Sequence, residues 1–314
     1  MPELPDINVY VQALSRRILN QRIITVRIKG PSLLRTFDPP VESIYGKPVT
    51  GISRFGKRIV IEVESNLFLV IHLMIAGRLL WKPPGTRPAG KYDLASIEFQ
   101  NGTLMLTEAS KQKRASLHIM NGRDSLLSLD SGGIDALTSS ESDFTSALVR
   151  QNRTLKRALT DPTIFSGIGN AYSDEILNAA KLSPLKLTHS LAADERTQLY
   201  LATRVILSHW IVALLQEFDL DGDSPGRFPK AGEITAFRPE FRVHGKFGQP
   251  CPVCKSRVQR IIRGDHETNY CPTCQTNGKI LADRSMSKLL GEDWPRTIDE
   301  WELMENQSKA RKEI

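Results

Sequence analysis

The chain has 314 residues, of which 40% are apolar and 25% charged, a composition typical of soluble globular proteins with room for two domains. Apolar runs fall short of the roughly 18–20 residues of a membrane span, and the acidic, proline-broken start is unlike a signal peptide, so we expect a cytoplasmic protein without a membrane partner. The 42 lysines and arginines exceed the 35 acidic residues by 7, which favours a polyanionic partner, although a solvated basic surface would give the same excess.

The first third of the chain predicts one helix followed by many short strands. Apolar residues recur at helical spacing over residues 6–20, and Asp6 after Pro5 is a plausible helix cap. Short β-rich runs separated by glycine and proline turns then follow, at 23–28, 58–63, 68–73, 79–81, 96–99 and 103–107. Regular short strands with such turns predict a β-sandwich or barrel.

The apolar period lengthens after residues 121–143, which are rich in glycine, serine and aspartate and predict a linker. We expect helices at about 143–150, 153–160, 171–181 and 191–217. Residues 218–241 predict a loop because glycine and proline are frequent there, and residues 281–314 carry mixed charges with weak helical character.

All four cysteines of the chain lie within one short segment. Two C-x-x-C pairs, Cys251/Cys254 and Cys271/Cys274, stand sixteen residues apart, which is zinc-site spacing. Two such turns supply the four thiolates of a closed tetrahedral site, so we predict one structural Zn²⁺. Between Arg242 and Arg263 there are six lysines or arginines and no acidic residue. This segment is either a solvated face or a metal-held hairpin that grips phosphate, and we favour the hairpin.

The amino terminus carries a candidate nucleophile. Removal of Met1 would leave Pro2 with a free secondary amine, and α-amino groups have a pKa of about 7.7–8.0, so much of it would be unprotonated near neutrality. Such an amine can attack a sugar aldehyde carbon, and Glu3 beside it could shuttle protons. Taken alone, residues 2–5 are more simply the start of a helix.

A glycine-containing turn, Gly167-Ile-Gly-Asn170, precedes one of the predicted helices. Two glycines permit close backbone approach, and the exposed amides at a helix start suit a phosphate. Asn170 could both cap that helix and contact phosphate. Taken alone, the motif is more simply an ordinary turn between helices.

Together and in this order, these elements resemble the formamidopyrimidine-DNA glycosylase and endonuclease VIII family of base-excision repair. The family's PELPE start is matched by residues 2–6, its strand lysine by Lys57, its His-Leu-Gly-Met-Ser-Gly turn by residues 72–77, its helix–two-turn–helix signature by residues 167–175 and its zinc finger by residues 251–274. The resemblance implies an α+β fold. It comprises an N-terminal β-sandwich domain with a flanking helix (1–130), a helical helix–two-turn–helix domain (131–240), a zinc-finger hairpin (241–280) and an extension of unassigned role (281–314).

The resemblance also implies an activity, namely removal of oxidised or otherwise damaged bases and cleavage at the abasic site through a Pro2 Schiff base. Pro2 would attack C1′, Glu3 would protonate the sugar ring oxygen, and Lys57 would serve both catalysis and phosphate binding. The implied DNA-binding residues are Lys57, His72, Met74, Ile75, Asn170 and His266. The implied partner is double-stranded DNA with damaged bases or abasic sites, bound by a monomer in the nucleoid-associated cytoplasm.

The chain departs from the family where the gap left by a flipped base is filled. Many members carry Asp-Pro-Arg-Arg-Phe there, whereas residues 108–114 read Glu-Ala-Ser-Lys-Gln-Lys-Arg. The methionine wedge of the turn aligns with Ile75, next to Met74, and either could insert. The zinc-finger arginine aligns with His266, whose charge depends on pH. Two alternatives stay open: a damage-specific DNA-binding protein without excision, and a lyase acting mainly on abasic sites.

Overall fold

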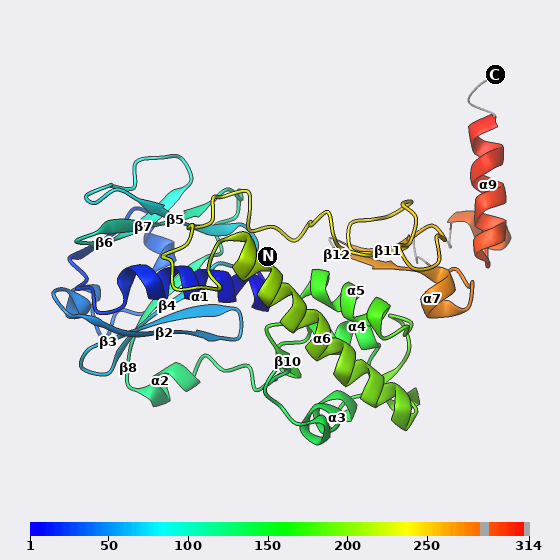
Figure 1. Cartoon of the computed structure of the whole chain (residues 1–314), viewed down its shortest axis with the longest axis horizontal. Coiled ribbons are helices and arrows are strands. Elements are labelled where there is room, and N and C mark those ends of the chain that lie inside the picture. Colours follow the sequence, from blue (N-terminus) through cyan, green and yellow to red (C-terminus); the bar gives the residue numbers. More distant parts are fainter. Residues whose placement is uncertain (265, 283–288, 311–314) are drawn as a thin grey trace. The chain divides into compact units, whose positions relative to one another are not determined.

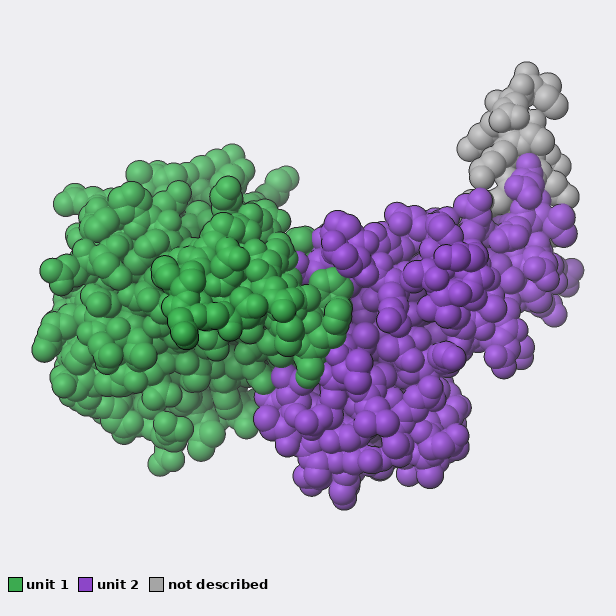
Figure 2. Space-filling model, in the orientation of Figure 1, with its two compact units in different colours: residues 1–133, 207–236 green, residues 134–206, 237–314 purple. Residues whose placement is uncertain are grey.

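The computed structural model describes residues 1–264, 266–282 and 289–310 (Figure 1). Contacts divide the chain into two compact units, which Figure 2 shows in different colours. Unit 1 comprises residues 1–133 and 207–236, and unit 2 comprises residues 134–206 and 237–314. The domain boundaries expected from the sequence stay a prediction.

Two antiparallel four-stranded sheets form most of unit 1, with the orders β1-β6-β7-β5 and β2-β3-β4-β8. The strands are β1 (Thr25–Ile28), β2 (Val49–Phe55), β3 (Arg58–Val63), β4 (Leu67–His72), β5 (Gly77–Lys82), β6 (Asp93–Phe99), β7 (Gly102–Glu108) and β8 (Ser116–Asn121). The predicted β architecture is confirmed, but β2 and β8 were not predicted. Residues of β2 read VTGISRF, with a register shift between Val49 and Gly51, and β8 contains polar residues, so neither gives a clean apolar alternation.

Helix α1 (Leu4–Ile18) packs against β2 and β3, and the Tyr10 hydroxyl accepts a hydrogen bond from the Leu79 amide of β5 at 3.3 Å. The helix begins two residues earlier than predicted. Glu3, and not Asp6, is its N-cap, since the Glu3 carboxylate accepts the amide of Asp6 while the Asp6 carboxylate accepts the Glu3 amide at 2.9 Å. This capping box fixes the first turn of the helix.

The remainder of unit 1 is mostly irregular. It contains the short helices η1 (Pro31–Leu33), η2 (Val41–Ile44) and α2 (Arg123–Leu127). Residues 218–241, of which 218–236 belong to unit 1, contain no helix or strand, as predicted. Within this loop, backbone carbonyls accept hydrogen bonds from the end of α1: Arg16 donates to Leu220 at 2.5 Å and Arg17 to Gly226 at 2.7 Å. These contacts hold the loop against the helix.

Unit 2 is mainly helical and contains the four predicted helices with boundaries shifted by a few residues. These are α3 (Glu141–Val149), α4 (Leu155–Thr160), α5 (Asn170–Ala179) and α6 (Ala193–Glu217), with η3 (Thr188–Ser190) and a parallel pair of β9 (Ile134–Asp135) and β10 (Phe165–Ser166). The last part of α6, from residue 207, belongs to unit 1.

Helix α6 is more apolar than the sequence analysis expected of any segment of this chain. By length and composition alone it could cross a membrane. Its residues Leu199, Leu207 and Leu214 are buried and recur every seven or eight positions, so they form one stripe along the helix. This stripe is the face of the helix that packs in the core, while apolar residues on its other faces, such as Val205 and Val212, are exposed.

The end of unit 2 is a hairpin followed by an additional helical segment. It comprises β11 (Gln259–Arg263), β12 (His266–Tyr270), α7 (Pro272–Thr276), η4 (Gly291–Asp293) and α9 (Ile298–Ala310). The weak helical character predicted for the tail corresponds to α9 (Figure 1). The Ile298 amide donates to Gly278 at 2.9 Å, and the buried Trp301 ring contacts Phe247 edge-on. The tail is therefore packed against the hairpin region.

Candidate active site and metal centre

Several strand ends of unit 1 meet at one place. Arg58 at the start of β3 pairs with His72 at the end of β4, and Gly77 at the start of β5 pairs with Glu108 at the end of β7. The turn of residues 73–76 connects β4 of one sheet to β5 of the other, so both sets of strand ends lie at the same end of the unit. We call this the site end; Lys57, which directly precedes Arg58, also lies there.

The amino terminus lies among charged groups of the site end. Burial lowers the pKa of the Met1 amine, Glu3 raises it, and the Arg78 and Lys57 cations lower it further. Pro2 and Glu3 are buried next to this amine. The structure therefore brings together three residues singled out from the sequence, Pro2, Glu3 and Lys57.

Lys57 and Arg78 are the two cations of this cluster, and each has identifiable neighbours. Burial lowers the pKa of the Lys57 ammonium, while the nearby Glu3 and Asp6 carboxylates raise it. Arg78 donates to the backbone carbonyls of Ile75, at 3.3 Å, and Gly77, at 2.7 Å. Sequence reasoning missed Arg78; a cation directly after the Gly77 turn was the available signal.

His72 is neutral at physiological pH. Burial, followed by the positive charges of Arg58 and Lys57, lowers the pKa of its imidazole to about 4. A neutral imidazole carries one N–H donor and one acceptor nitrogen. His72 can thus form hydrogen bonds at the site end without adding charge.

The turn after His72 presents the two wedge candidates differently. Ile75 is 56% exposed, whereas Met74 is partly buried and has a left-handed backbone (φ 51°). Gly77 closes the turn by donating to the Leu73 carbonyl at 2.9 Å, and a Cβ there would lie 2.2 Å from that carbonyl oxygen. Only glycine fits this position, so the turn holds Ile75 toward solvent.

In unit 2, Asn170 is the first residue of α5, and Gly169 is its N-cap without a side-chain bond. The expectation that Asn170 caps this helix is therefore wrong. Its side-chain amide instead donates to the Glu267 carbonyl of β12 at 2.9 Å, and its own carbonyl accepts from Lys156 at 2.6 Å. Asn170 thus connects the helix start to the hairpin strand.

A buried polar network that sequence reasoning missed surrounds this helix. The Asp174 carboxylate accepts from Lys156 at 2.5 Å and lies 2.7 Å from His244 Nδ1, while the neighbouring Glu175 carboxylate accepts the amides of Val243 and His244 at 2.9 Å. An acidic pair in the middle of a helix, Asp174-Glu175, was the signal for it. The network ties α5 to the segment that leads into the cysteines.

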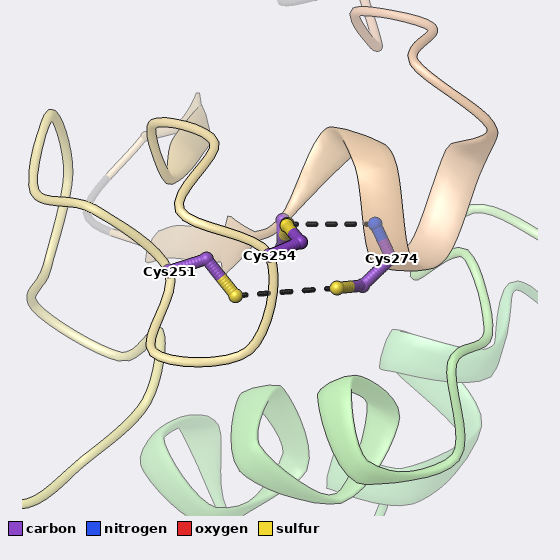
Figure 3. Close-up of side chains that lie close together, drawn as sticks. Cys251, Cys254 and Cys274 are labelled. Atoms are coloured by element: carbon purple, nitrogen blue, oxygen red, sulfur yellow. Dashed lines mark hydrogen bonds between the residues drawn. The ribbon is translucent and has the colours of Figure 1, made fainter.

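The four cysteines come together as one ligand set. Figure 3 shows Cys251 and Cys254 on one loop, with Cys274 facing them. Cys271 is the N-cap of α7, and Cys274 lies in the first turn of that helix. All four sulfurs lie within 4.8 Å of one another, with Cys254 and Cys271 at 3.3 Å and Cys251 and Cys274 at 4.0 Å. Tetrahedral zinc–thiolate bonds of about 2.3 Å place sulfurs about 3.8 Å apart, so the set fits a closed structural zinc site. The remaining DNA-binding candidate, His266, belongs to β12, and its side chain lies outside the described part of the structure.

Three family models match successive parts of the chain. The formamidopyrimidine-DNA glycosylase N-terminal domain matches residues 1–114, the formamidopyrimidine-DNA glycosylase H2TH domain matches residues 133–214, and the zinc finger found in FPG and IleRS matches residues 248–277. A formamidopyrimidine-DNA glycosylase of Solibacter usitatus is 31% identical over 278 residues, covering 88% of this chain and 99% of the relative. The chain belongs to the formamidopyrimidine-DNA glycosylase family.

Other members of the formamidopyrimidine-DNA glycosylase family support the same assignment. The enzyme of Lactococcus lactis subsp. cremoris is 28% identical and covers 88% of this chain and 99% of its own length. A crystal structure of a Lactococcus lactis FPG variant with Fapy-dG-containing DNA matches with a TM-score of 0.76 at 27% identity, over 88% of this chain and 100% of that one. A complex of Lactococcus lactis Fpg with abasic-site DNA matches with a TM-score of 0.74 at 25% identity, over 87% and 99%.

The family assignment agrees with the α+β fold and the zinc centre predicted from the sequence. The β-sheet unit, the helix–two-turn–helix region and the four-cysteine finger are all present, and the finger binds one structural Zn²⁺. The matched domains end at residue 277, so α9 lies beyond them.

Proposed function

We propose that this chain is a base-excision-repair DNA glycosylase with abasic-site lyase activity, and that the Pro2 amine is its nucleophile. The observation that carries the proposal is the amino terminus at the site end, where burial and the cations Arg78 and Lys57 lower the pKa of the Met1 amine. Removal of Met1 would place the amine one residue further along, beside Glu3. Solved family members with Fapy-dG and abasic-site DNA support the substrate class.

The proposed chemistry needs an unprotonated amine and a proton shuttle. The Pro2 nitrogen attacks C1′ while the bond from C1′ to the damaged base breaks, and its electron pair leaves with the base, which takes up a proton. Glu3 delivers a proton to the sugar ring oxygen as the ring opens to an iminium. Loss of the C2′ proton then expels the 3′ phosphate, and a further elimination expels the 5′ phosphate.

DNA contacts are proposed from both units. In unit 1, Lys57 and the neutral His72 would bind phosphates around the lesion, and Ile75, with Met74 beside it, would enter the gap left by the flipped nucleotide. In unit 2, Asn170 and His266 would bind phosphate. The zinc ion holds Cys251–Cys274 as one rigid module, which supports the basic hairpin; it takes no part in the chemistry.

The localisation follows from this role. A DNA repair enzyme of this family is soluble and intracellular. We further propose that it works as a monomer in the cytoplasm, associated with the nucleoid.

Borohydride trapping tests the nucleophile. The protein is mixed with duplex DNA containing an abasic site, borohydride reduces the iminium, and the adduct is digested and mapped by mass spectrometry. We expect the sugar on the peptide that begins with Pro2, in the wild type and in a Lys57→Gln variant alike. An adduct on Lys57 would overturn the assignment.

The same assay separates the two alternatives. A damage-binding protein without chemistry would bind lesion duplex with a steep salt dependence but trap no adduct and release no base. A lyase acting mainly on abasic sites would trap on abasic DNA but release no base from oxidised-purine or oxidised-pyrimidine duplexes.

A further inference from the structure

The site end carries an exposed aromatic ring that the sequence analysis did not consider. Tyr92 is 46% exposed and stands directly before β6. The turn that carries it is fixed at both ends, because the Gly90 amide donates to the Asp93 carboxylate at 2.7 Å and the Asp93 amide donates to the Gly90 carbonyl at 3.1 Å. Lys29 adds a bond to the Gly90 carbonyl at 2.8 Å. The ring therefore projects from a well-supported turn.

Pairing across the sheet places this ring beside the wedge turn. The Tyr92 carbonyl accepts the amide of Glu108 at 2.8 Å, and Glu108 pairs with Gly77 on the other side. Tyr92, the end of β7 and the turn bearing Ile75 are thus successive neighbours along one edge. This edge is the site end of unit 1.

The segment between β7 and β8 lies against the ring and is positively charged. Lys113 Nζ lies over the Tyr92 ring at 5.4 Å from its centroid, and Lys91 Nζ, from the turn before β6, lies over it at 5.6 Å, so a stacking base would take the place of an ammonium group that then binds phosphate. Lys111 and Arg114 on the same segment are exposed. An exposed aromatic ring among cations is the combination that binds a nucleic acid through base stacking and phosphate contacts.

A single carboxylate fixes the shape of that segment. Buried Glu108 accepts the backbone amide of Arg114 at 3.0 Å and that of Ala115 at 3.1 Å, and its own carbonyl accepts Lys113. The segment contains no aromatic residue that could stack on a base. Tyr92 is the neighbouring residue that could do so.

We propose that the Tyr92 ring stacks on the DNA bases next to the gap left by the flipped nucleotide, with Lys91 and Lys113 binding the flanking phosphates. The inference rests on the proposed function and extends it, because it assigns the aromatic contact to a position outside the β7–β8 segment. Ile75 and Tyr92 then approach the gap from adjacent turns. Removing a base–aromatic stack weakens binding by about fivefold or more.

The experiment measures lesion selectivity with a stable probe. Binding is measured to a duplex containing a tetrahydrofuran abasic analogue opposite 2-aminopurine, and to the matched undamaged duplex. Tyr92→Ala is expected to raise the Kd for the analogue duplex at least about fivefold, while the Kd for the undamaged duplex stays within about twofold of the wild-type value. The variant should also change the 2-aminopurine fluorescence of the complex. Tyr92→Phe should behave as the wild type, and Tyr92→Leu as Tyr92→Ala.

Two controls match the variants. Lys113→Gln is expected to weaken binding to both duplexes by the same factor, because a phosphate contact does not depend on the lesion. Lys82→Gln, at the opposite end of β5, should change the affinity for neither duplex. Leu127→Ala, an exposed apolar residue of α2, should also change neither.

The proposal is overturned if Tyr92→Ala and Tyr92→Leu bind the analogue duplex as the wild type does, or if both duplexes lose affinity equally. Borohydride trapping by the wild type is run in parallel. If the wild type traps DNA but the Tyr92 variants bind both duplexes as the wild type does, only the Tyr92 proposal is rejected. If the wild type traps no DNA, the proposed nucleophile is rejected, and the binding comparison still tests Tyr92.

Discussion

Asp174 Oδ2 lies 2.7 Å from His244 Nδ1, and this contact joins α5 to the segment leading into the zinc centre. The same oxygen accepts the Asn269 amide of β12 at 3.1 Å, and the other carboxylate oxygen accepts Lys156. One fully buried carboxylate therefore connects three parts of unit 2 that are far apart in sequence. Asp174 organises the position of the hairpin relative to the helix that carries Asn170.

Neutralising this carboxylate should be costly. Asp174→Asn leaves the buried Lys156 ammonium without its carboxylate partner, although the Asn170 carbonyl and the Ser173 hydroxyl still accept from it, and breaking such a buried pair typically costs about 3–5 kcal/mol. Urea unfolding in the presence of zinc measures the loss. The control is Glu267→Gln, which removes a partly solvent-exposed pair with Arg260 and should cost less than about 1 kcal/mol. Equal losses in the two variants would show that the buried pair contributes nothing special.

The pH dependence of trapping should depend on Arg78. A nearby positive charge disfavours the protonated amine, so removing it in Arg78→Met should raise the pKa of the terminal amine. The acid limb of the trapping rate is then expected to shift to higher pH in the variant. Single-turnover trapping rates between about pH 5 and 9 give both profiles. Superimposable profiles would show that Arg78 does not act on the nucleophile.

His72 should make the fold sensitive to acid. Its pKa is about 4 in the folded protein against an ordinary value of 6.5, so the unfolded chain binds more protons between these values. The stability from neutral His72 is complete above about pH 6.5 and is lost as the pH falls toward 4. Between pH 7 and 4.5, the free energy of unfolding of His72→Gln should fall by about 1–3 kcal/mol less than that of the wild type. Urea midpoints at both pH values test this, and parallel losses would count against it.

Removal of zinc should loosen the finger while leaving unit 1 folded. The four thiolates and the apolar residues Val243 and Val258 form one small cluster, which has little other core. Cys274→Ser or a chelator is expected to abolish the protection of amides in residues 248–277 from hydrogen exchange. Zinc content should fall from one ion per chain to none in Cys274→Ser, and unchanged protection without metal would contradict the prediction.

The packed tail predicts a separate effect on the hairpin. Trp301 is buried against Phe247, and the Arg260 guanidinium lies over the Phe247 ring at 4.3 Å from its centroid. Trp301→Ala should cost about 3 kcal/mol or more in the stability of this region. Hydrogen exchange of β11 and β12 reports it, with exposed Leu303→Ala on the same helix as the control.

Much of the fold could be predicted because its signals are local. The short strands, the four helices and the cysteine spacing each follow from a pattern within a few residues, and the structure has them nearly where expected. Strand β2 is not predicted because Gly51 and polar residues interrupt its apolar alternation. The predicted start of α1 lies two residues too late because Asp6, which looks like an N-cap, is the third residue of the helix and completes the capping box from there. Local pattern cannot distinguish an N-cap from a third helical residue when both are acidic.

The site was only partly predictable because strand pairing and tertiary packing, and not a local sequence motif, bring some of its residues together. Lys57, Glu3 and Pro2 were found from motifs, but Arg78 and Tyr92 carry no motif and come to the site end through strand pairing. The link from Asp174 to His244 spans seventy residues and has no signal in either segment alone.

Glu108 has a consequence for how this enzyme could be altered. The Glu108 carboxylate accepts the amides of Arg114 and Ala115, and the Glu108 carbonyl accepts the Lys113 ammonium, so both ends of the β7–β8 segment are fixed at Glu108 and residues 109–112 form the loop between them. New sequences can therefore replace the loop between Glu108 and Lys113 without repacking the sandwich. Lesion range could then diversify by replacing these four residues, while the nucleophile and the zinc finger stay unchanged.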